Sequence, residues 1–158
     1  MDRIILLTLK AEIVKELENL ERLSDELGAI KSKNTPVYLR SKGSILHDFY
    51  NCCERIFKKV AFEMNGSLDE SDRWHKALLY KMTINIDGIR PALISNSLAG
   101  QLYDYLSFRH LFRNIYGFEL KKDKIDFLIK KHRQVTNDFI IELKEFLLFL
   151  DNQIQKEG

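Results

Sequence analysis

The chain has 158 residues, which is long enough to form a hydrophobic core. Of these, 45% are hydrophobic and 30% are charged, a composition typical of a soluble helical protein and unlike that of a disordered chain. The net charge is only +2 at pH 7, so the overall field does not favour nucleic acid or a membrane, and any anion binding must come from local clustering. Only 2 prolines and 7 glycines interrupt the sequence, which favours a few long helices.

The cysteines and the N-terminal residues exclude several classes of protein. Cys52 and Cys53 are adjacent, and neighbouring helical positions point in different directions, so we expect no disulfide between them. The sequence has no CxxC or Cys/His spacing typical of a metal site, and we therefore predict no metal, no cofactor and a reduced, cytoplasmic location. The apolar run 4–7 soon meets Lys10 and Glu12, so it is too short for a signal sequence or a membrane span.

Two long amphipathic helices are predicted in the first part of the chain. From about 2 to 27, apolar residues recur three or four positions apart, and Gly28 is the expected C-terminal cap. Thr35 followed by a proline is typical of a helix start and predicts a second helix over about 36–64. Gly43 weakens this helix midway, where we expect a kink or close helix packing.

The middle of the chain predicts a shorter helix and then a break. Residues 69–71 can cap a third helix over about 72–84, which has apolar residues on one face. Pro91 after the break reads as the first turn of a short apolar stretch that reaches Ile94.

Two more helices complete the expected fold. Residues 95–97 can cap a helix that runs to about 116, where Gly117 would end it in a left-handed conformation. The last helix is expected over about 122–155. We therefore predict an all-α, up-and-down helical bundle of four to five helices that forms a single domain over residues 1–158.

A polar cluster interrupts the apolar pattern at the end of the fourth predicted helix. On a helix, Arg109, Arg113 and Tyr116 fall near one line, and His110, Arg113 and Asn114 near a second. Because burial of an unpaired charge is costly, we expect this cluster to open onto a cleft, a subunit interface or an anion. The alternative is a helix face whose charges pair with acidic residues elsewhere, such as Asp48, Glu54 or Glu119.

This cluster resembles the motif of the HEPN superfamily (higher eukaryotes and prokaryotes nucleotide-binding), specifically its HepT-like toxin branch. The family motif is an Arg, a polar residue after it, a His four to six residues later and, in HepT toxins, a Tyr two positions beyond the His. Arg109 matches the family Arg, His110 the polar neighbour and Tyr116 the Tyr, whereas Asn114 stands where the family has His. The order of the helices is also similar over most of the chain.

The resemblance implies an HEPN-like bundle that acts as a metal-independent endoribonuclease and as a homodimer, with the two motifs facing each other across a cleft. Its catalytic set here would be Arg109, His110 and Asn114, with Arg113 binding RNA phosphate. Such cleavage uses the ribose 2′-OH as nucleophile, so the site must accept its proton and stabilise charge on the phosphorus oxygens. Because an Asn side chain cannot transfer a proton, either His110 has taken over this step, or activity is weakened, or the site only binds.

The resemblance also implies partners. HepT toxins are silenced by a small nucleotidyltransferase antitoxin that attaches AMP to the motif Tyr, which would be Tyr116 here, and RNA would be the substrate. We predict no membrane partner. The alternative function is a non-catalytic HEPN module that binds nucleotide, RNA or a nucleotidyltransferase through the same cleft. A structural helical dimer is a third possibility, and it would be favoured if the whole cluster were salt-bridged.

Overall fold

The computed structural model describes residues 1–31, 33–65 and 73–158, and within these it is a helical bundle. Its elements are α1 (Arg3–Ala29), α2 (Pro36–Met64), α3 (Trp74–Lys81), α4 (Asn96–Asn114), the 3₁₀ turn η1 (Gly117–Glu119) and α5 (Lys122–Lys156). The described residues contain no strand and only one isolated bridge, between Ile86 and Arg90. The predicted all-α bundle of four to five helices is therefore confirmed, with five α-helices in the described residues.

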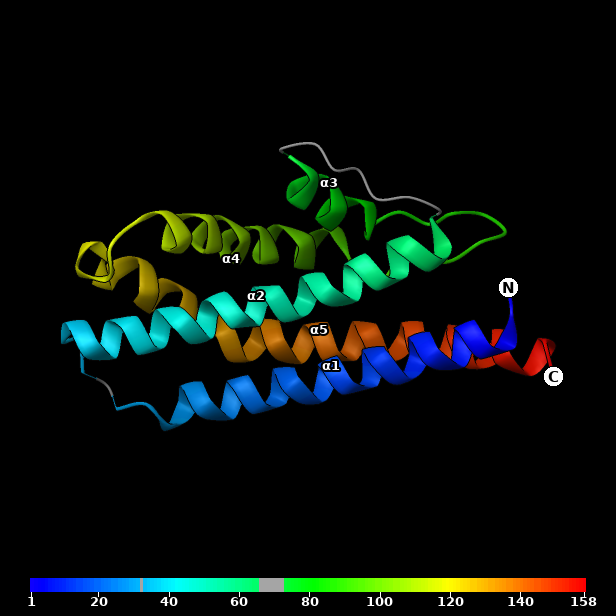
Figure 1. Cartoon of the computed structure of the whole chain (residues 1–158), viewed down its shortest axis with the longest axis horizontal. Coiled ribbons are helices and arrows are strands. Elements are labelled where there is room, and N and C mark those ends of the chain that lie inside the picture. The colour runs from blue at the N-terminus through cyan, green and yellow to red at the C-terminus, as the bar shows by residue number, and fades with distance from the viewer. Residues whose placement is uncertain (32, 66–72) are drawn as a thin grey trace.

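The four long helices run up and down along a common direction (Figure 1). α1 and α2 lie side by side in opposite directions, α5 runs along both of them, and α4 covers the other side of α2. The short helix α3 is set on top of α2 and α4, away from α1. Because α2 packs against all the other helices and η1, it is the central element that positions the site.

The core is formed by the apolar stripes of these helices. Aromatic rings fill its centre, where Phe49 and Phe57 of α2 meet Tyr105 of α4 and Phe139 of α5. All four side chains are fully buried, and each such ring removes a large apolar area from water. Packing of this kind explains why helices with ordinary intrinsic propensities are stable here.

Three predicted helix starts are correct, and at one of them the expected cap is formed. Ser95 is the N-cap of α4, and its hydroxyl accepts a hydrogen bond from the backbone N–H of Leu98. Thr35 is the N-cap of α2 and is followed by Pro36, although its hydroxyl forms no capping hydrogen bond. α5 begins at Lys122, as expected.

The predicted glycine caps are wrong at both positions. α1 continues through Gly28 to Ala29, and α4 ends at Asn114, three residues before Gly117. Neither glycine has a positive φ angle. Gly117 begins η1, and the exposed Arg40 side chain of α2 lies against it, so a Cβ there would require Arg40 to move.

Gly43 is a position of close helix packing, one of the two outcomes predicted for it. α2 runs through Gly43 without a break, and a Cβ atom built there would lie 2.9 Å from a ring carbon of Phe112 in α4. The absence of a side chain therefore lets α4 approach α2 at the end that carries the polar cluster.

The middle of the chain differs from the prediction. The expected capping residues 69–71 lie outside the described residues, and α3 covers only Trp74–Lys81. The stretch after Pro91 is not helical; there Arg90 is buried and donates hydrogen bonds to the carbonyls of Ile84 and Lys81. These bonds hold the loop onto the end of α3.

The described residues agree with two further expectations. Cys52 and Cys53 are buried and free, so they form no disulfide. No helix in this part of the chain combines the length and the apolar character that a membrane span needs.

Candidate functional site

A row of polar side chains on α2 faces the motif region of α4. His47, Asn51, Glu54 and Lys58 follow one another at intervals of three or four residues, so they lie along one face of the helix. Nδ1 of His47 lies 3.2 Å from the amide nitrogen of Asn51, and Lys58 lies 3.8 Å from Glu54. Glu54 itself is buried, with 3% of its surface exposed, and so it requires a charged partner.

Arg109 of α4 is that partner. Its two terminal nitrogens donate to the two carboxylate oxygens of Glu54 at 3.0 and 3.2 Å, a bidentate arrangement. Nη1 also donates to the amide oxygen of Asn51 at 2.8 Å, and the guanidinium lies 5.0 Å from the ring centre of Tyr50. With only 4% of its surface exposed, Arg109 is a buried, fully paired charge that fixes α4 against α2.

His75 of α3 joins this pair from the other side. Its Nδ1 lies 2.9 Å from Oε2 of Glu54 and 2.8 Å from Nη2 of Arg109. The imidazole also packs on the neighbouring indole of Trp74, with 3.6 Å between the ring centres. α2, α3 and α4 thus meet at one buried carboxylate.

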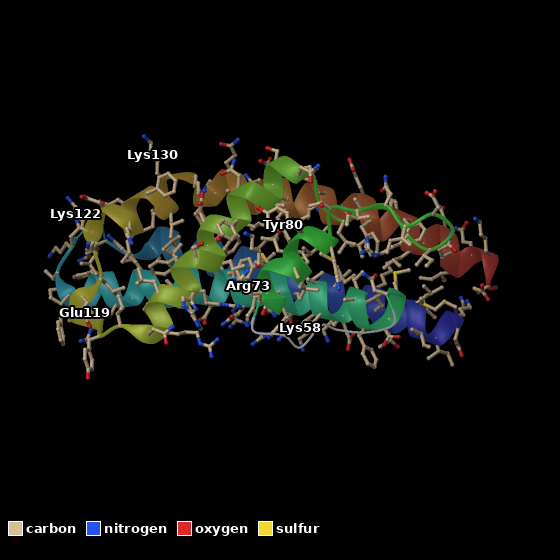
Figure 2. All side chains as sticks on the ribbon, turned by 90° about the horizontal axis from the view of Figure 1, so that it is seen from above. Lys58, Arg73, Tyr80, Glu119, Lys122 and Lys130 are labelled. Atoms are coloured by element: carbon tan, nitrogen blue, oxygen red, sulfur yellow. The ribbon has the colours of Figure 1, made fainter. Side chains whose placement is uncertain are left out.

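A cleft of about 450 Å³ opens above this buried group, between α3 and α4. Figure 2 looks onto this side of the molecule, with Arg73 and Tyr80 labelled near α3. None of the described residues that line the cleft is acidic. Its polar lining consists mainly of cationic and imidazole side chains: Arg73, His75, Lys76, Arg109, His110 and Arg113. Such a lining concentrates positive charge locally in a chain whose net charge is small.

The structure brings together only part of the predicted site. His110 and Arg113 are exposed and line the cleft, whereas Arg109 lies at its buried base. Asn114 turns away: its amide donates a hydrogen bond of 2.6 Å to the carbonyl of His110 within the last turn of α4. Within the described residues His110 and Arg113 form no ion pair, so the fully salt-bridged cluster that would favour a structural dimer is not observed.

Tyr116 lies outside the helix that was expected to carry it. It precedes η1, where its backbone N–H donates to the carboxylate of Glu119 at 2.9 Å. Its ring is 71% exposed and lies nearly parallel to that of Phe118, which is 70% exposed. The phenol is therefore accessible, at the end of the molecule where η1 connects α4 to α5 (Figure 1).

Burial controls the titration of Tyr50 under the site. Desolvation, reinforced by the nearby Glu54 carboxylate, raises the pKa of the Tyr50 phenol well above its usual value. This phenol therefore stays protonated and neutral beneath the guanidinium of Arg109. No group of three His, Cys, Asp or Glu side chains among the described residues is arranged to hold a metal ion.

The family comparison gives this arrangement its context. A family model described as HepT-like protein matches residues 41–150, more than two thirds of the chain. The chain belongs to the HepT-like family. The match covers all of α3 and α4 and most of α2 and α5, which includes every side chain of the cleft. Searches of the curated proteins and of the solved structures each find no match.

Within this HepT-like protein, sequence reasoning missed the contribution of α2 and α3. Glu54 was named as one of three alternative partners of the cluster, and its position four residues after the buried Tyr50 was the available signal, because an acid on an apolar face needs a partner. For His75 the sequence carried no comparable signal. Its contact with Glu54 depends on how α3 folds back across α2.

Proposed function

We propose that this HepT-like protein is a toxin-type, metal-independent endoribonuclease of the HEPN superfamily. The observation that carries the proposal is the cleft between α3 and α4, which brings the motif residues His110 and Arg113 together with further cationic groups and no described carboxylate. This lining fits the phosphodiester backbone of RNA, since guanidinium and ammonium groups bind phosphate oxygens.

The exposed motif residues supply groups suited to the chemistry. The His110 imidazole can pass a proton to or from a reacting oxygen, and the Arg113 guanidinium can stabilise the charge of a phosphorane in the transition state. The attacking oxygen is the ribose 2′-OH, so the products are a 2′,3′-cyclic phosphate and a 5′-OH. Because Arg109 is already paired with Glu54, we assign it the task of orienting α4 and not that of binding phosphate.

The family resemblance also suggests two protein partners for this chain. We propose that two copies of the chain associate with their motifs facing each other, and that a nucleotidyltransferase antitoxin modifies Tyr116. The 71% exposure of the Tyr116 ring supports this assignment, since the phenolic oxygen must reach an active site on another protein.

Cleavage of labelled RNA in EDTA tests the ribonuclease. The wild type should produce 2′,3′-cyclic phosphate ends, His110→Asn and Arg113→Ala should each lose about 10²-fold or more of the rate, and Lys144→Ala on the exposed face of α5 should match the wild type. EDTA removes metal-dependent contaminating nucleases. An absence of cleavage by the wild type would refute this function.

A second candidate is a non-catalytic HEPN module that binds RNA, nucleotide or the nucleotidyltransferase through the same cleft. It is favoured by Asn114, which cannot transfer a proton and whose side chain bonds to its own helix. The variant Asn114→His separates the two functions: recovery of cleavage from an inactive wild type, with unchanged RNA binding, would indicate the binding module.

A further inference from the structure

We propose that His75, held by Glu54, is the general base of this site, and that it works with His110 as a pair of imidazoles. This inference rests on the proposed ribonuclease function and adds a residue from outside the motif. Cleavage of RNA by its 2′-OH needs two proton transfers, one at each side of the phosphorus atom, and two imidazoles can carry out one each.

His75 is paired with the buried carboxylate of Glu54. Oε2 of Glu54 lies 2.9 Å from Nδ1 of His75, and a charged carboxylate is a stronger acceptor than an imidazole nitrogen. Nη2 of Arg109 lies 2.8 Å from the same nitrogen but already donates to Glu54, so we assign the ring proton to Nδ1, which donates it to the carboxylate. In this tautomer Nε2 carries the lone pair that a general base needs.

Glu54, which holds His75, is itself held in place. Glu54 is itself fixed by two hydrogen bonds from Arg109, and Arg109 is fixed by Asn51. A base oriented by a third group, which is in turn immobilised, is the arrangement that activates nucleophiles in many hydrolases. Arg109 thereby becomes a positioning residue for His75.

His75 lies where a bound phosphodiester can reach it. His75 is partly exposed, with 31% of its side chain accessible, and it lines the cleft together with His110 and Arg113. The two imidazoles come from different helices, α3 and α4, so a phosphodiester in the cleft has an imidazole available from each wall. Asn114, at the motif position that usually carries His, does not line the cleft.

The proposed reaction transfers one proton at each side of the phosphorus atom while one bond to phosphorus forms and another breaks. Nε2 of His75 takes the proton of the 2′-OH while the 2′-oxygen forms a bond to phosphorus, with Arg113 on the non-bridging oxygens. The bond from phosphorus to the 5′-oxygen breaks, and the protonated imidazole of His110 donates its proton to that oxygen. The products leave as the cyclic phosphate and the 5′-OH, and exchange with water restores both imidazoles.

The test compares His75→Asn with His110→Asn on two substrates in EDTA. In His75→Asn the new side chain keeps an amide N–H near the position of Nδ1 for Glu54 but cannot take up a proton. On RNA, each variant should lose about 10²-fold or more. On nucleoside 3′-(4-nitrophenyl) phosphates the leaving nitrophenolate needs no proton, so His110→Asn should approach the wild-type rate while His75→Asn stays slow. Lys81→Gln, on the exposed side of α3, is the matched control.

Two further measurements separate chemistry from structure. Binding of a fluorescent 2′-O-methyl RNA, which lacks the nucleophile, should be unchanged within about twofold in His75→Asn, and its thermal unfolding should stay close to that of Lys81→Gln. A loss of RNA binding that accounts for the loss of cleavage would overturn the catalytic assignment.

The outcomes also separate this inference from the proposed function. Wild-type cleavage that persists in His75→Asn would refute the role of His75 and leave the ribonuclease intact. Restored nitrophenyl ester cleavage in His75→Asn, with loss in His110→Asn, would refute His75 as the base. A wild type inactive on both substrates would refute the ribonuclease and, with it, this inference.

Discussion

Arg109 and His110 are adjacent in the sequence, yet one is buried in an ion pair and the other is exposed at the cleft. Successive residues of a helix are rotated by about 100°, so fixing Arg109 towards α2 determines where its neighbours point. Arg113 lies four positions after Arg109, about one helical turn further along α4, and its side chain also lines the cleft beside α3. The buried pair therefore sets the rotation of α4 about its own axis and so the exposure of His110 and Arg113.

The first prediction concerns this ion pair. Glu54→Gln should destabilise the fold by about 3 kcal/mol, because it leaves a buried guanidinium without a counter-charge. The double variant Glu54→Leu/Arg109→Met, which removes both charges, should recover much of that loss. Urea unfolding of these variants, of the two single changes Glu54→Leu and Arg109→Met and of the wild type measures the coupling, and simple additivity of the single changes would contradict it.

The second prediction concerns His132 of α5, which stands between Lys131 and Arg133 in the sequence but is only 2% exposed. Its ring packs edge-on against Phe49, and its Nε2 has no hydrogen-bond partner among the described residues. Burial lowers the pKa of His132 to about 4, aided by the charge of Arg133. The folded state therefore resists protonation of this ring.

The sign of the pH dependence follows from that difference. Between the ordinary value of about 6.5 and about 4, the unfolded chain binds a proton that the fold does not, so stability falls as the pH falls through this window, by about 3 kcal/mol in total. His132→Leu should flatten this part of the curve of unfolding free energy against pH. Lys130→Ala, an exposed neighbour, should keep the wild-type slope.

At the scale of elements, sequence periodicity predicted the long helices because each buries a continuous apolar stripe. It failed where tertiary contacts decide. Gly117 begins η1 close to Arg40 of α2, and α3 packs across α2 and α4; contacts between residues so far apart in the sequence leave no local periodic signal. Helix periodicity likewise indicated that His110 and Arg113 lie near each other on α4, whereas the position of His75 beside Glu54 and the cleft depends on how α3 packs. The single-domain prediction for residues 1–158 remains a prediction.

Gly43 and Gly100 allow a prediction about the packing of α2 against α4, with Gly100 as the control. Gly43→Ala should destabilise the protein by about 1 kcal/mol or more, because the added methyl group would press on Phe112. Gly100→Ala in α4, where nothing lies within 4 Å, should stabilise it by about 0.5–1 kcal/mol through helix propensity alone. Thermal unfolding measures both, and equal shifts for the two variants would show that α2 and α4 are not closely packed at Gly43.

For the whole molecule, the relevant electrostatic quantity is the local charge of the cleft, since the chain carries a net charge of only +2. Binding of single-stranded RNA releases counterions in proportion to the phosphates neutralised, with a slope of about −0.7 in log affinity against log salt for each. The cleft offers Arg73, Lys76 and Arg113 for this purpose.

We predict that Arg113→Ala reduces the magnitude of this salt slope by about 0.7, the contribution of one phosphate contact. Lys144→Ala, an equal change in total charge outside the cleft, should leave the slope unchanged. Titration of fluorescent 2′-O-methyl RNA at several salt concentrations gives both values. Equal effects of the two substitutions would mean that RNA responds to net charge and not to the cleft.

The small size of α3 has a consequence for heat inactivation. This helix has eight residues, too few to be stable in isolation, and it rests on the bundle through Leu78, Leu79 and the contact of His75 with Glu54. Elements with little buried surface open at a lower free-energy cost than the global unfolding of the protein. We therefore expect α3 to detach on warming while α1, α2, α4 and α5 stay folded. One wall of the cleft is then lost, and the proposed RNA cleavage declines, several degrees below the melting temperature of the bundle.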